Sequence, residues 1–253
     1  MSRWTSPDGL TIHYIVEGDP GAPTVILQHG FASSGEGNWR RSGIAAQLVQ
    51  AGFRIVLMDA RGHGLSDKPH DPAFYGEAKM ALDLMGVAGA LDLNRYHLVG
   101  YSMGAVVALL VAVQDPRVTR LAVGGIGEGV LDRGGLDRSV LSNLALAEGL
   151  LADDTTGLSP MVAGFRRFVE ANKGDRHALA AHAKVVHSDP IALNRIVAQT
   201  LVFAGADDPL ASNPHRLADA IPTSRLKVLA GDHLGVFNEP ALPGEIVTFL
   251  QQG

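Results

Sequence analysis

One stretch of the sequence decides the fold: Leu98-Val99-Gly100-Tyr101-Ser102-Met103-Gly104-Ala105-Val106-Val107-Ala108-Leu109-Leu110. Its apolar runs predict a short buried strand over 96–101 and a helix over 103–114, which has no Gly or Pro after its first turn. Ser102 then lies on a sharp strand-to-helix turn, with its hydroxyl exposed above a sheet. A glycine-rich turn that only connects the two elements is the alternative, so the flanking sequence has to decide.

The composition narrows the class of protein. The 253 residues suffice for one large domain, or for a domain with an insertion. The formal charge of −5 is spread without long blocks of either sign, so nucleic acid is not an expected partner. The chain has no cysteine, which excludes disulfides, a thiolate nucleophile and thiolate metal sites.

Localisation is also predicted from the sequence. The first nine residues lack the basic-then-apolar pattern of a signal peptide. The longest apolar run, Ala105 to Val113, is much shorter than a bilayer span. We therefore expect a cytoplasmic protein without a membrane partner; the sequence does not indicate an oligomeric state.

Strand and helix patterns alternate on both sides of the Ser102 turn, with short glycine-bearing connections. Such alternation is typical of an α/β fold with a mostly parallel sheet, right-handed crossovers and helices on both faces. The predicted strands cover residues 10–17, 24–28, 53–58, 96–101, 121–126, 199–205 and 224–229. The predicted helices of this part cover residues 38–51, 73–91, 103–114, 213–221 and 240–251.

The alternation is interrupted between residues 127 and 189. This segment has no strand-like run, and its apolar patterns predict helices over 136–151, 160–172 and 176–186. The simplest interpretation is a helical cap at 127–189, inserted over the C-terminal edge of a core formed by 1–126 and 190–253.

Two later strands are followed by residues that could assist a nucleophilic serine. Asp207-Asp208 follows the strand ending at Gly205, and Gly231-Asp232-His233 follows the strand ending near Leu229. Because functional groups of an open parallel sheet collect beyond the C-terminal ends of its strands, we expect these side chains near Ser102.

Five motifs occur in the order found in α/β-hydrolase fold proteins, and the chain resembles that family over essentially its whole length. They are His29-Gly30-Phe31, Asp59-x-Arg61-Gly62-His63-Gly64-x-Ser66, Gly100-Tyr101-Ser102-Met103-Gly104, Gly205-x-x-Asp208 and Gly231-Asp232-His233. The resemblance implies an eight-stranded, mostly parallel sheet with a small helical cap. It also implies a catalytic triad with Ser102 as nucleophile, His233 as general base and acid, and Asp208 as the group that orients His233. Asp207 is the alternative acid.

The resemblance implies further site residues. The backbone amides of Phe31 and Met103 are expected to form the oxyanion hole, and Tyr101 and Trp39 to contact the substrate. His29 and His63 are expected to hold loops by hydrogen bonds. His177, His182 and His187 are five residues apart, so they cannot share one helical metal-binding face and are expected to be solvated or interhelical. Arg166-Arg167 predicts an exposed helix face rather than an acid-binding site.

The predicted function is hydrolysis of a small-molecule carboxylic ester through an acyl-enzyme, with no cofactor and no metal. Ser102 at the turn argues against haloalkane dehalogenase and epoxide hydrolase relatives, which carry a carboxylate there. Enol-lactonases, carbon–carbon bond hydrolases and cofactor-free perhydrolases or haloperoxidases share the triad and stay open. A non-enzymatic small-molecule receptor on the same fold is a further alternative.

Overall fold

A single sheet organises the computed structural model, which describes residues 2–135 and 140–252. Within these residues eight strands lie in the order β1-β2-β4-β3-β5-β6-β7-β8. They are β1 Ser2–Thr5, β2 Thr11–Glu17, β3 Thr24–Gln28, β4 Arg54–Met58, β5 Tyr96–Tyr101, β6 Val118–Gly124, β7 Gln199–Gly205 and β8 Ser224–Leu229. Strand β2 is antiparallel to β1 and β4, and the remaining neighbours are parallel. The expected mostly parallel, eight-stranded sheet is confirmed.

Strand β1 is the one strand that the residue pattern does not reveal. Its four residues are mostly exposed, so they lack the apolar alternation of a half-buried strand. It pairs with β2 from Ser2 opposite Tyr14 to Thr5 opposite Thr11. It is an edge strand of the sheet, and Trp4 is its one residue that packs, partly buried, against the larger core.

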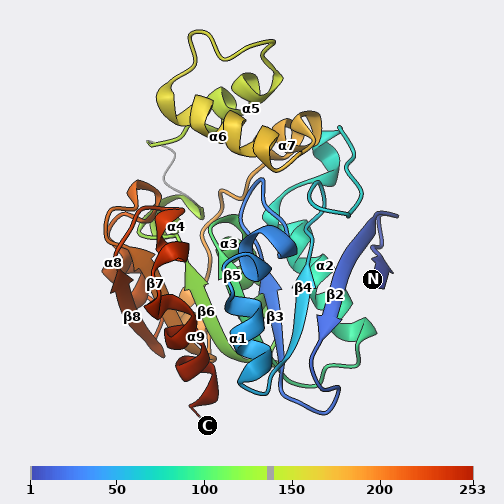
Figure 1. Ribbon diagram of the computed structural model, residues 1–253, viewed down its shortest axis with the longest axis vertical. Helices are drawn as coiled ribbons and strands as arrows, with labels where there is room; N and C mark the ends of the chain where they lie inside the picture. Colours follow the sequence, from blue (N-terminus) through green and yellow to red (C-terminus); the bar gives the residue numbers. More distant parts are fainter. Residues whose placement is uncertain (1, 136–139, 253) are drawn as a thin grey trace.

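Helices cover both faces of the sheet (Figure 1). They are α1 Ile44–Gln50, α2 Glu77–Ala90, α3 Met103–Gln114, α4 Gly129–Arg133, α5 Asn143–Leu151, α6 Pro160–Ala171, α7 Arg176–Ala183, α8 Pro214–Asp219 and α9 Ala241–Gln251. Helices α2, α3 and α8 contribute to one core, and α1 and α9 contribute to the other. Each completely buried Val, Leu or Ile side chain contributes about 1.5–3 kcal/mol to stability.

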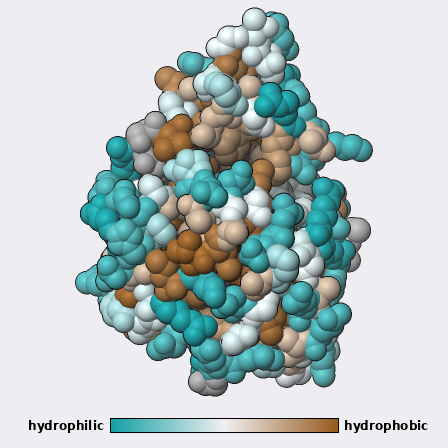
Figure 2. Space-filling view, turned by 60° about the vertical axis from the view of Figure 1, so that its left-hand side comes forward, coloured by the Kyte–Doolittle hydropathy of each residue, from teal (hydrophilic) through white to brown (hydrophobic). Residues whose placement is uncertain are grey.

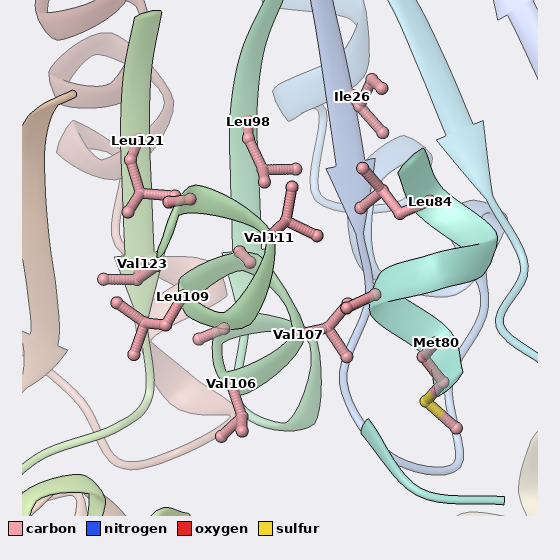
Figure 3. Close-up of a cluster of buried hydrophobic side chains, with 14 of the residues drawn as sticks. Ile26, Met80, Leu84, Leu98, Val106, Val107, Leu109, Val111, Leu121 and Val123 are labelled. Carbon is pink, nitrogen blue, oxygen red and sulfur yellow. The ribbon is translucent and has the colours of Figure 1, made fainter. Parts of the chain in front are cut away.

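Helix α3 lies in the centre of the larger core. Figure 3 shows Val107 of α3 beside the α2 side chains, and Leu98 and Leu121 of the sheet beside α3. Nearly all of α3 is buried, which explains why its sequence is continuously apolar rather than amphipathic. This packing fixes the direction in which the N-terminus of α3, and therefore Ser102, faces.

Two predicted helices are interrupted by glycines with positive φ. The predicted helix 38–51 consists of a π-type turn, Glu36–Arg40, and then α1, with Gly43 at φ +78° between them. The predicted helix 73–91 consists of a 3₁₀ turn, Pro72–Phe74, and then α2, with Gly76 at φ +109°. Further 3₁₀ turns are Leu193–Arg195, Pro209–Ala211 and Gly235–Asn238.

Helices α5, α6 and α7, called the cap helices below, lie beyond the C-terminal ends of the strands (Figure 1). Ser142, Ser159 and Asp175 accept hydrogen bonds from backbone N–H groups in the first turns of the three helices. The prediction for 136–151 falls partly on residues 136–139, which lie outside the described residues, and helix α5 covers only the later part of that range. The short helix α4 was not predicted.

Arg166 corrects one prediction about the cap helices. Its side chain is buried, and its guanidinium donates to the backbone carbonyls of Gly149 (2.8 Å) and Ala152 (2.9 Å) and to Glu170 (2.6 Å). The predicted exposed face is therefore wrong at this residue. The cation instead pairs with the carbonyl groups at the C-terminal end of α5, where the helix dipole favours positive charge.

Candidate active site

Ser102 lies at the turn between β5 and α3, in the conformation that the sequence predicts for a nucleophile. Its φ and ψ are +54° and −118°, values that a non-glycine residue rarely adopts. Its backbone N–H donates to Gly124 of the neighbouring strand β6 (2.8 Å). The strained residue is thus held by the sheet on one side and by α3 on the other.

Gly100 and Gly104 are required by close packing on both sides of Ser102. A Cβ atom on Gly104 would lie 2.3 Å from the carbonyl oxygen of Gln28, and one on Gly100 would lie 2.2 Å from that of Gly104. Real Cβ atoms do not approach backbone atoms so closely. These glycines therefore allow α3 to pack against β3 and β5 directly after the turn.

The structure brings the side chains of Ser102, His233 and Asp208 together in one hydrogen-bonded row. His233 Nε2 lies 3.0 Å from Ser102 Oγ, and His233 Nδ1 lies 2.8 Å from Asp208 Oδ2. Asp208 also accepts the backbone N–H of Leu210 through Oδ1 (2.9 Å), which fixes its carboxylate. Asp207 is exposed, and its backbone N–H donates to Gly231. Of the two adjacent aspartates, Asp208 is therefore the one whose carboxylate contacts His233.

The loop after β3 passes directly beside Ser102. A Cβ atom on Gly30 would lie 3.4 Å from the Ser102 Cβ atom, and the Gly30 N–H donates to Asn38 Oδ1 (2.8 Å). Phe31 is the next residue in this loop. Met103 is the first residue of α3, so its N–H has no acceptor within the helix. Both expected oxyanion donors thus belong to backbone next to the serine.

Tyr101 and Trp39, the two predicted substrate contacts, differ in position. Tyr101 lines the cavity described below, but its hydroxyl donates to the backbone carbonyl of His233 (2.5 Å). Burial and the negative charges of Asp208 and Asp232 raise the pKa of Tyr101 well above its usual value, so this donor stays protonated. Tyr101 therefore positions the His233 loop.

Trp39 is fully buried in the core and packs edge-on against Phe237, with their ring centroids 6.1 Å apart. It does not line the cavity. The prediction that Trp39 contacts substrate does not fit this position, because the π-type turn that carries Trp39 directs its ring into the core beside α1 and α9.

A cavity of about 410 Å³ separates the cap helices from Ser102 and His233. Figure 2 shows a hollow below the uppermost helices with hydrophobic residues around it. Its wall is mainly apolar and includes Phe31, Leu146, Met161, Phe165 and Phe168. Among the lining residues in the described part of the chain there is no lysine or arginine. The described part of the wall therefore suits a small, largely apolar molecule.

Two polar residues of the cavity wall were not predicted as site residues. Glu77 is the first residue of α2 and His182 belongs to α7; both are buried, and their side chains approach within 3.4 Å. His182 is thus interhelical, one of the two expected environments, but it also faces the cavity. No sequence signal links these residues, because they belong to separate elements that only the packing of α7 on the core brings together.

His29 and His63 hold loops, as expected. The Ala60 N–H donates to His29 Nε2 (3.0 Å), and His63 Nδ1 lies 2.9 Å from the Arg61 carbonyl oxygen. Burial lowers the pKa of both residues, so their rings are neutral at pH 7.

In residues 2–135 and 140–252 no group of three or more His, Asp or Glu side chains is arranged to hold a metal ion. No helix in these ranges is long and apolar enough to cross a bilayer.

The family model, two related sequences and one solved structure that match this chain are all described as hydrolases. The family described as alpha/beta hydrolase fold matches residues 23–126. A 2-hydroxy-6-oxononadienedioate/2-hydroxy-6-oxononatrienedioate hydrolase of Paraburkholderia xenovorans is 32% identical over 220 residues, 79% of this chain and 75% of the relative. A Pseudomonas putida hydrolase of the same description is 30% identical over 264 residues, covering 92% and 91%. The crystal structure of a hydrolase from Pseudomonas aeruginosa superimposes with a TM-score of 0.81 at 27% identity, covering 99% and 98%.

Proposed function

Because the chain belongs to the α/β-hydrolase family and is a hydrolase, we propose that it cleaves uncharged carboxylic esters through an acyl-enzyme on Ser102. The observation that carries the proposal is the 3.0 Å approach of His233 Nε2 to Ser102 Oγ at the wall of an apolar cavity. In this proposal residues 127–189 act as a cap over a core made of residues 1–126 and 190–253.

The first half of the reaction forms the acyl-enzyme. His233 takes the proton from Ser102 Oγ, which attacks the ester carbonyl carbon and moves the carbonyl electron pair onto oxygen. The amides of Phe31 and Met103 stabilise this oxyanion, and each such donor typically contributes about 3 kcal/mol to lowering the barrier. The oxyanion then collapses, the carbon–oxygen bond to the alcohol breaks, and the departing oxygen takes the proton from His233.

The second half returns the enzyme to its starting state. A water molecule loses a proton to His233 and attacks the acyl carbon, and as the acid forms Ser102 Oγ leaves and takes that proton back from His233. Asp208 holds the His233 ring so that Nε2 faces the serine throughout, and its charge stabilises the imidazolium in both steps.

The lining of the cavity favours esters over the dienedioates named for two relatives. A dienedioate carries two carboxylates, and binding it in a low-dielectric cavity requires cationic partners. The described lining has no lysine or arginine and includes the acidic residues Glu77 and Asp232. We therefore place carbon–carbon cleavage of a dianionic substrate second to hydrolysis of neutral esters.

The test is turnover of p-nitrophenyl acetate, butyrate and octanoate by wild type and by Ser102→Ala. We expect wild-type hydrolysis and a loss in kcat on the order of 10⁴-fold or more in the variant, because the nucleophile is removed. Ser188→Ala, at an exposed serine, is the matched control and should retain wild-type rates. Equal rates in wild type and Ser102→Ala, or no turnover of any ester by wild type, would contradict the proposal.

A further inference from the structure

Glu77 of the core and His182 of the cap helices form a polar corner of the cavity. Glu77 Oε1 lies 3.4 Å from His182 Nε2, at the long end of the range for an ion pair, and both residues line the cavity. The side chain of Glu77 is 6% exposed and that of His182 is 1% exposed, so both groups are largely buried at the cavity wall. Such groups ordinarily have well-formed hydrogen bonds when they are buried.

The hydrogen bonds of this corner are incomplete. Glu77 Oε2 accepts the backbone N–H of His187 (2.5 Å), which leaves Oε1 facing His182. In the described part of the chain His182 Nδ1 has no hydrogen-bond partner, and His182 Nε2 meets only Glu77 Oε1, at 3.4 Å and without the geometry of a well-formed hydrogen bond. A buried polar group without a hydrogen-bond partner lowers stability unless a ligand or a water molecule supplies the missing hydrogen bond.

Aromatic contacts, rather than hydrogen bonds, hold the His182 ring in place. Its centroid lies 5.7 Å from that of Tyr75, nearly parallel to it, and 5.6 Å from that of Phe31. Phe31, His182 and Ser102 all line the cavity. A polar group held by His182 would therefore lie within the same cavity as the scissile bond.

The carboxylate of Glu77 is charged. Burial would raise its pKa, but the adjacent His182 imidazole and the backbone N–H of His187 outweigh burial and lower it. An ionised carboxylate only accepts hydrogen bonds, whereas an imidazole N–H donates. The corner thus offers one acceptor and one donor within a few ångströms.

We propose that Glu77 and His182 bind a hydroxyl group of the substrate, which donates to Glu77 Oε1 and accepts an N–H of His182. A hydroxyl is the smallest group that supplies one donor and one acceptor at a single atom. A methyl group forms no hydrogen bond with Glu77 or His182, and a carboxylate is repelled by the charge of Glu77. This inference rests on the proposed function, because it assigns the substrate class of the same site: hydroxyl-bearing neutral esters.

The experiment compares p-nitrophenyl esters that differ only at the end of the acyl chain. For each of three chain lengths the end group is hydroxyl, methyl or carboxylate, as in 6-hydroxyhexanoate, heptanoate and pimelate monoesters. Monoacetates of linear diols and the matching alkyl acetates make the same comparison in the alcohol half. At one length we expect kcat/KM for the hydroxyl ester to exceed that of the methyl ester about tenfold or more. The carboxylate ester should be the poorest substrate.

Two variants test whether Glu77 and His182 cause the preference for hydroxyl esters. Glu77→Gln removes the charge at nearly constant size, and His182→Leu removes the donor. We expect the hydroxyl-to-methyl ratio, measured within each variant, to fall about five- to tenfold toward one. Glu148→Gln, at an exposed glutamate of α5, should keep the wild-type ratio.

Each outcome is decisive. A wild-type ratio near one at every length, or a ratio that survives in both variants, overturns the hydroxyl site while plain ester turnover leaves the proposed function intact. If wild type hydrolyses no ester of either series, the proposed function fails and the hydroxyl site fails with it.

Discussion

Two histidine–aspartate pairs among the described residues have nearly the same distance between histidine Nδ1 and aspartate Oδ2. His233 Nδ1 lies 2.8 Å from Asp208 Oδ2, and His13 Nδ1 lies 2.9 Å from Asp59 Oδ2. Both aspartates follow a strand of the sheet, and a serine side chain lies near each pair. The two arrangements nevertheless differ in what the second imidazole nitrogen faces.

In the first pair, His233 Nε2 reaches Ser102 Oγ at the wall of the cavity. In the second pair, His13 Nε2 is buried without a hydrogen-bond partner among the described residues, and Ser66 Oγ donates to the Asp59 backbone carbonyl (2.6 Å) instead of to a histidine. The Asp59 carboxylate also accepts backbone N–H groups of two loops. A histidine–aspartate pair can therefore serve chemistry only where its outer nitrogen faces a nucleophile and a space for substrate.

Of the substitutions that test this comparison, Asp208→Asn is expected to have the largest effect on kcat. Asp208→Asn removes the acceptor that fixes His233, so we expect kcat for p-nitrophenyl butyrate to fall on the order of 10⁴-fold. The free energy of unfolding should change by less than about 1 kcal/mol, because the amide oxygen can still accept the Leu210 N–H. Steady-state kinetics and urea unfolding measure both quantities. A fall of less than tenfold would show that Asp208 does not serve catalysis as the first pair requires.

Asp59→Asn should have the opposite effect. The carboxylate accepts the N–H groups of Gly35 and Leu65 and contacts His13 Nδ1, so its loss leaves buried donors without a charged acceptor. We expect the free energy of unfolding to fall by about 3 kcal/mol, with kcat/KM at low temperature within about threefold of wild type. Retained stability with a large loss of kcat would break the distinction between the two pairs.

His97 is a histidine that contacts a threonine instead of a carboxylate. Its substitution is expected to have the smallest effect, a change in how stability depends on pH. Its Nδ1 contacts Thr119 Oγ1 (2.8 Å), and burial, with the positive charges of Arg120 and Arg95, lowers its pKa from 6.5 to about 4. Between these values the unfolded chain binds more protons than the folded protein, so stability falls as pH falls from 6.5 to 4.

The full shift corresponds to about 3 kcal/mol, which solvent screening at this half-buried residue reduces to about 1 kcal/mol. His97→Gln should therefore lose about 1 kcal/mol less stability than wild type between pH 7 and pH 4.5, measured by urea unfolding at each pH. Identical pH dependence in both proteins would show that His97 does not need to be neutral in the fold.

Much of the fold and of the site could be predicted because it depends on local rules. The Gly-x-Ser-x-Gly turn needs a strand before it and a helix after it, and both are visible as apolar runs. Parallel strands end at the same edge, so residues that follow β5, β7 and β8 meet there regardless of their separation in the chain. The meeting of Ser102, Asp208 and His233 at this edge follows from the same rule, whereas the expected oxyanion amides came from the family resemblance.

Other features were decided only by tertiary packing. Trp39 and Arg166 resemble a pocket residue and a surface residue in sequence, yet one fills the core and the other pairs with carbonyls at the end of α5. The Glu77–His182 corner joins the core to the cap helices. Hydrophobic periodicity specifies which face of an element is buried, but it does not specify which distant element covers that face. That choice determines which polar groups meet inside the cavity.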